Sequence, residues 1–137
     1  MATKNNVLDR KKESSDKISA QVRTLGVGIL ALTWGLLASD SAIAKQMATT
    51  LRMPLLRAGT LAVLVILLDY MQYFFAHEVA RLLLNQMERD GLNEGQYNYK
   101  SWPYRLMYWL FYGKQALLLL VTVYLLCNIG WFVVVRK

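Results

Sequence analysis

The sequence has little of what builds metal, haem and disulfide sites. It holds one cysteine, one histidine and two prolines in 137 residues. A single cysteine, Cys127, cannot form a disulfide framework within one chain. His77 cannot supply both axial ligands of a haem, and the pair His77-Glu78 lacks the second histidine of a zinc-protease motif. We therefore expect no metal and no cofactor.

Catalytic patterns are also missing from the sequence. The glycines lie in no strand-turn-helix context that could cradle a phosphate, and no serine or cysteine nucleophile stands beside a base. Only Asp69, His77 and Glu78 could exchange protons at an accessible site. The sequence thus predicts a protein without catalytic residues that is not an enzyme.

What the sequence does have is long apolar blocks, since 55% of its residues are hydrophobic. A helix needs about 20 apolar residues to cross the roughly 30 Å of hydrocarbon in a bilayer. Three blocks are long enough, at 22–39, 58–76 and 115–135. They predict an all-α integral membrane protein with three transmembrane helices in residues 21–137, preceded by a basic arm in residues 1–20.

The first block is the weakest candidate for a membrane span, and it has an alternative interpretation. A basic leader followed by a moderate apolar run is also typical of a cleaved signal peptide, and the small residues from Ala38 to Ala42 resemble a cleavage region. The leader is long and strongly polar, however, and two further apolar blocks follow. These features favour a span, with Arg23 near its end reaching toward lipid headgroups.

Basic residues predict the orientation of the spans, because cytoplasmic segments are enriched in lysine and arginine. One side carries eleven: Lys4, Arg10, Lys11, Lys12, Lys17, Arg23, Arg81, Arg89, Lys100, Arg105 and Lys114. The other side carries five: Lys45, Arg52, Arg57, Arg136 and Lys137. We expect a multi-pass protein of the cell inner (plasma) membrane, with the N-terminus in the cytoplasm and the C-terminus outside. The net charge of +7 is then mainly a topology signal.

Spans two and three are predicted to extend into the cytoplasm as helices. The helical pattern of the second block continues as far as Gly91, a typical helix end. Before the third block, Ser101 is a plausible cap and Pro103 would lie in the first turn of a helix. An interfacial helix broken from the span near Gly113 is the alternative.

Shorter elements are predicted around the first span. Ser15 or Asp16 could cap the helix that enters it, which would leave the residues before them as a mobile or ligand-ordered arm. After the span, Asp40 or Ser41 could cap a short surface helix over 42–52. Pro54 would mark a turn before the second span.

Asp69 is the most informative residue, because it is the only formal charge inside the second and third blocks. Gln72, Tyr73 and His77 follow it on the same helix face, so that face should avoid lipid. Asp69, Gln72 and Tyr73 form the predicted intramembrane polar site. Three roles are open: a structural bond across helices to Thr33, Asn128 or Tyr124, the wall of an oligomeric pore, and a proton relay.

Small residues repeat on one face of the first span. They are Thr24, Gly28, Ala31, Gly35 and Ala38, at steps of four, three, four and three residues. Such a face allows helices to approach closely. We predict helix packing through Gly28, Ala31, Gly35 and Ala38.

The basic arm is the predicted contact for a soluble ligand. Its cations include Arg10, Lys11, Lys12 and Lys17, which could receive an anionic ligand, a protein partner or an anionic lipid. Acidic residues interrupt the run, and no nucleic-acid-binding motif is present. Nucleic acid could also be a partner, but no motif in the sequence supports it.

Two functions fit these features. The first is a homo-oligomeric pore or ion-channel effector, gated from the cytoplasm by an anionic ligand or partner; the second is a membrane anchor or accessory subunit of a larger complex. In size and layout the chain resembles phage holins, anchor subunits of respiratory complexes and small multi-span effectors of bacterial antiphage defence. That resemblance is one of architecture alone.

Overall fold

The computed structural model describes residues 4–91 and 100–135, and of the side chains before Ser15 it describes only that of Glu13. Within these ranges the chain forms four helices: α1 (Lys4–Ala38), α2 (Ala42–Thr50), α3 (Arg52–Asp90) and α4 (Trp102–Val135). Three of them have the length and composition to cross a membrane, through Ser15–Ala38 of α1 and through the whole of α3 and α4. The prediction of an all-helical chain with three candidate spans is confirmed.

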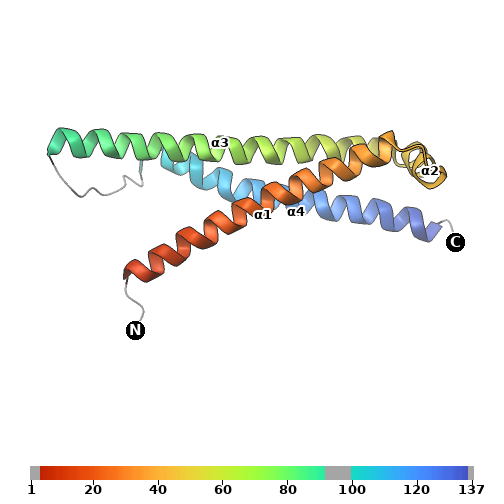
Figure 1. Ribbon diagram of the computed structural model, residues 1–137, viewed down its shortest axis with the longest axis horizontal. Coiled ribbons are helices and arrows are strands. Elements are labelled where there is room, and N and C mark those ends of the chain that lie inside the picture. Colours follow the sequence, from red (N-terminus) through yellow and green to blue (C-terminus); the bar gives the residue numbers. More distant parts are fainter. Residues whose placement is uncertain (1–3, 92–99, 136–137) are drawn as a thin grey trace.

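Helix α3 is the central element of the bundle (Figure 1). It runs antiparallel to α1 and α4 and packs against both, whereas α1 and α4 touch each other much less. Helix α2 lies at one end of the molecule, and the end of α3 and the start of α4 lie toward the other. Toward its N-terminus, α1 diverges from the other two long helices.

The core between the helices is narrow and contains small side chains. Leu55, Ala58 and Ala62 of α3 are buried, as are Val121 and Leu125 of α4. At Gly59, α3 lies close to α1, because an added Cβ would be 3.1 Å from Thr33 Oγ1. A side chain at this position would require Thr33 to shift by a few tenths of an ångström, so glycine suits the close approach of the two helices.

Most of the large apolar side chains point away from this core. Trp34 and Val63 are exposed, and so are Leu119, Leu126 and Val134 on α4. In water such a surface would be a severe aggregation liability, whereas in hydrocarbon it is the favoured one. The outward apolar surface fits the three candidate spans.

Several predicted helix ends are confirmed by local chemistry. Ser41 caps α2, with its hydroxyl accepting from the Ala44 amide at 3.2 Å. Helix α3 ends at Gly91, whose φ of 62° is left-handed and suits glycine. Helix α4 starts at Trp102, directly after Ser101, and places Pro103 in its first turn.

Three boundary predictions need correction. Helix α1 begins at Lys4 and runs without a break past Ser15 and Asp16, so neither residue caps it. The turn before the second span is at Leu51, and Pro54 lies in the first turn of α3, where its missing amide hydrogen costs no bond. Helix α4 continues through Gly113, so there is no separate interfacial helix.

Candidate functional site

A charged cluster joins the three long helices inside the bundle. Asp69 of α3 accepts from Lys114 Nζ of α4 through one carboxylate oxygen. Its other oxygen accepts from Arg23 of α1, at 3.0 Å from Nε and 2.9 Å from Nη2. Lys114 Nζ also donates to Ser19 Oγ of α1 at 2.8 Å. We call Arg23, Asp69 and Lys114 the Asp69 triad.

The triad is buried unequally. The side chains of Asp69 and Lys114 are 3% and 0% exposed, whereas that of Arg23 is 54% exposed. A buried ion pair is held by mutual attraction at low dielectric, and removing one partner leaves the other charge uncompensated, typically at about 3–5 kcal/mol. Because two cations face one carboxylate, the triad carries a formal charge of +1. Its excess cation is Arg23, at the rim.

Aromatic rings complete the surroundings of both cations. The guanidinium carbon of Arg23 lies 5.4 Å from the ring centre of Tyr73, and Lys114 Nζ lies 5.6 Å from that of Phe111. Both distances are within the range of cation–π attraction. Each cation of the triad thus has an aromatic neighbour as well as the carboxylate.

The partners of Asp69 differ from those predicted as interhelical bonds. Thr33 Oγ1 donates to the Leu30 carbonyl at 2.9 Å, and Asn128 Nδ2 donates to the Tyr124 carbonyl at 2.8 Å. These polar groups are thus satisfied within their own helices. Asp69 instead binds the two basic residues that were assigned to the span boundaries.

This placement also changes the charge count behind the predicted orientation. Lys114 is buried in the bundle and Arg23 is bound to Asp69 at its rim, so we do not count either residue as marking a cytoplasmic boundary. Without them, nine basic residues remain on the predicted cytoplasmic side against five on the other. The asymmetry is smaller but keeps its sign.

The predicted polar site is divided between the core and the rim. Gln72 is buried one turn after Asp69, and its Oε1 has no hydrogen-bond partner. Tyr73 is 43% exposed and lies beneath Arg23, and His77 is exposed. Of the four residues on the predicted polar face, only Asp69 and Gln72 are therefore buried in the interior of the single chain.

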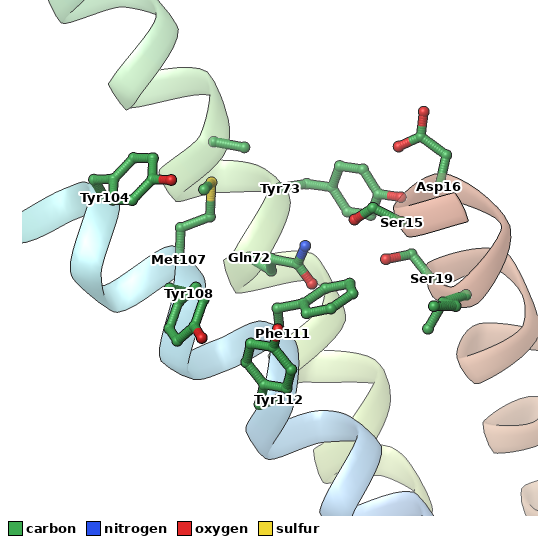
Figure 2. A pocket seen from close by; sticks show the side chains of 12 residues that line it. Ser15, Asp16, Ser19, Gln72, Tyr73, Tyr104, Met107, Tyr108, Phe111 and Tyr112 are labelled. Atoms are coloured by element: carbon green, nitrogen blue, oxygen red, sulfur yellow. The ribbon is translucent and has the colours of Figure 1, made fainter. Parts of the chain in front are cut away.

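A pocket lies beside the triad, where α1 diverges from α3 and α4 (Figure 2). Its volume is about 450 Å³. The walls come from all three long helices: Ser15, Asp16, Ile18 and Ser19 of α1, Gln72, Tyr73 and Ala76 of α3, and Tyr104, Met107, Tyr108, Phe111 and Tyr112 of α4. The cavity is not among the features that the sequence predicts.

The predicted packing face of α1 is not used within the chain. Gly28, Ala31, Gly35 and Ala38 are all exposed, and an added Cβ at Gly28 or Gly35 would meet no atom within 4 Å. The contact with α3 uses the opposite face of α1, including Gly26 and Thr33. The small-residue face therefore points outward.

The basic arm is the start of α1. The backbone of Arg10, Lys11 and Lys12 is helical, and their side chains lie outside the described residues. Lys17 is exposed and pairs with Glu13 at 2.7 Å along the helix. Such an exposed pair contributes little to stability.

Comparison with known proteins assigns no family. No protein-family model matches the chain, and no curated protein or solved structure matches it significantly.

Proposed function

We propose that the chain is a non-enzymatic membrane effector that assembles from several copies into a pore. The observation that carries this proposal is the outward small-residue face of α1, formed by Gly28, Ala31, Gly35 and Ala38. In lipid, helices associate mainly through close packing, and interfaces are enriched in such residues. A face that is small, exposed and opposite to the contact with α3 is suited to a second copy of the chain.

The Asp69 triad would keep the assembly closed. Asp69 and Gln72 are buried inside each chain, so neither lines an open pathway in this conformation. Arg23 and Ser19 attach α1 to charged groups of α3 and α4, while α1 has few other contacts with α4. Release of α1 at this point would remove Arg23 from the cluster and expose the Asp69–Lys114 pair and Gln72, polar groups that could line a pore.

The gating signal would act on the end of α1 that carries the basic arm. Arg10, Lys11, Lys12 and Lys17 supply positive charge on the same helix as Arg23. An anionic ligand or an acidic partner that draws this segment away would weaken the ion pair between Arg23 and Asp69. In this proposal the arm lies in the cytoplasm of a bacterial cell, and antiviral defence is one setting that suits such an effector.

The test compares glycine-to-leucine changes on different helix faces. Gly28→Leu and Gly35→Leu should convert the oligomer to monomers in native mass spectrometry and lower cation conductance in planar bilayers at least tenfold, because leucine would separate the touching backbones. Gly130→Leu is the matched control, since Gly130 of α4 is also exposed with open space around its Cα. It should preserve both readouts.

Two results would reject the pore. One is a monomeric wild-type chain at all protein concentrations, and the other is a wild-type oligomer that conducts no ions. If Gly130→Leu had the same effect as the α1 variants, the α1 face would not be the interface.

A second candidate function, a membrane anchor or accessory subunit, is favoured by the last turns of α3. From Ala80 to Asp90 no residue of this described helix is buried, and Leu82 and Leu84 are exposed. An exposed apolar surface on a segment that extends past its neighbours suits a protein partner. A partner at unit stoichiometry, lost with Leu82→Glu and retained with Gly28→Leu, would favour the anchor over the pore.

A further inference from the structure

Two adjoining cavities lie at the α2 end of the bundle. The larger has a volume of about 560 Å³ and is formed where the end of α1, the helix α2 and the start of α3 meet. The smaller, of about 90 Å³, follows the contact between α1 and α3. Leu37 and Leu56 line both cavities, so the two adjoin each other. We call the larger cavity the basic pocket and the smaller one the apolar groove.

The basic pocket carries a net positive charge. Its charged lining residues are Asp40, Lys45 and Arg52, which give a formal charge of +1. Lys45 pairs with Asp40 at 3.0 Å, whereas Arg52 has no ion pair or hydrogen bond from its side chain to any described residue. The guanidinium of Arg52 is therefore the uncompensated charge, and it is available to an anion.

The apolar groove has a lining that suits a hydrocarbon chain. Trp34 and Val63 form its exposed rim, at 60% and 51% exposure. Two hydroxyl groups also line it, those of Thr33 and Thr60, and each donates at 2.9 Å to a carbonyl of its own helix. Polar groups that are satisfied in this way are tolerated beside hydrocarbon.

We propose that the basic pocket and the apolar groove together bind an anionic phospholipid. Its phosphate contacts Arg52, and one acyl chain runs along the groove against Leu56, Trp34 and Val63. The order of the two cavities matches the molecule, because the charge lies where the candidate spans α1 and α3 meet α2, and the groove extends along the spans. From Leu56 to Val63 the helix rises about 10 Å, which is a large part of one leaflet. The inference stands on these two cavities and does not depend on pore formation.

Trp34 provides a local probe for this lipid, because brominated acyl chains quench the fluorescence of a tryptophan that they touch. The other three tryptophans, Trp102, Trp109 and Trp131, are exposed and are replaced by phenylalanine. The full chain is placed in phosphatidylcholine vesicles that contain brominated phosphatidylglycerol or, in the matched sample, the same fraction of brominated phosphatidylcholine. We expect phosphatidylglycerol to bind at Trp34 about fivefold more tightly, the effect of one basic residue near an anionic headgroup.

Three charge variants test the role of Arg52. Arg52→Gln should abolish the preference for phosphatidylglycerol. Arg57→Gln is the matched control and should keep it, because Arg57 is also an exposed arginine of α3 but lines neither cavity and lies about 140° further round the helix. Asp40→Asn should raise the preference about twofold, since it removes an exposed carboxylate from the basic pocket.

Native mass spectrometry of the wild-type chain gives a second measurement that needs no tryptophan replacement. From an equal mixture, the chain should retain phosphatidylglycerol over phosphatidylcholine, and Arg52→Gln should lose this selectivity while Arg57→Gln keeps it. Equal binding of the two lipids in both measurements would overturn the proposal. The same loss in both arginine variants would also overturn it, because it would show a general attraction of the basic surface and no site at Arg52.

Discussion

At the residue scale, Asp69 is one of two described side chains, with Lys114, that bond to both of the other long helices. It accepts hydrogen bonds from α1 and from α4, and it is itself part of α3. A carboxylate in hydrocarbon is costly, and two cations offset that cost here. Its role in the single chain is thus to hold three helices together.

Removing the charge of Asp69 should therefore destabilise the bundle. Asp69→Asn leaves Lys114 buried without a counter-charge, and we expect a loss of about 3–5 kcal/mol of unfolding free energy. Lys114→Gln should cost a similar amount, because it leaves the carboxylate with only the exposed Arg23. The measurement is reversible unfolding in detergent micelles.

The double variant Asp69→Asn/Lys114→Gln is the control for this prediction. An amide pair can keep a hydrogen bond without any charge, so the double variant should be more stable than the sum of the two single losses predicts. Strictly additive losses would show that the Lys114 pair contributes nothing to stability.

The sequence indicated Asp69 but not its partners. A lone charge in an apolar block requires a compensating partner, and this requirement can be recognised in the sequence alone. Arg23 and Lys114 border apolar blocks, where long cations ordinarily reach headgroups, so their contacts with Asp69 depend on helix rotation and tilt. Those quantities come from packing between elements, which no local pattern encodes.

At the element scale, the helix ends divide into predictable and unpredictable ones. Ser41 and Gly91 satisfy backbone groups through their own chemistry, so each was visible in the sequence. The start of α1 was not, because its first turns are polar on all sides and resemble a flexible arm. The pocket was also hidden, since it arises from the divergence of α1 from α4.

Two glycines should respond oppositely to the same substitution. Gly113 lies inside α4 with open space around it, so Gly113→Ala should stabilise the chain by roughly 0.5–1 kcal/mol through helix propensity. Gly91 has a φ of 62°, so Gly91→Ala should destabilise it by about 1 kcal/mol. Thermal unfolding in detergent measures both. A destabilising Gly113→Ala would argue for a break in α4 at this position.

At the scale of the whole molecule, α2 lies at one end of a bundle with three candidate spans, and the end of α3 and the start of α4 lie toward the other. We expect the α2 end to face outward and the α3–α4 end to face the cytoplasm, because basic residues are more numerous at the latter. In a Cys127→Ser background, a membrane-impermeant thiol reagent added from outside should label Ala48→Cys and not Asp90→Cys. Labelling of Asp90→Cys alone would reverse the orientation.

The pairing of Asp69 with Lys114 also bears on how the chain enters a membrane. A lysine or aspartate at the centre of a lone helix costs about 2.5–3.5 kcal/mol on insertion, and less near an interface. Forty-five residues separate the two charges, and they lie on successive antiparallel helices. If each helix entered the lipid separately during synthesis, its charged residue would be inserted without the opposite charge, at the full free-energy cost. We therefore expect α3 to wait in the insertion channel until α4 arrives, so that the two enter the lipid as one hairpin with their charges already neutralised.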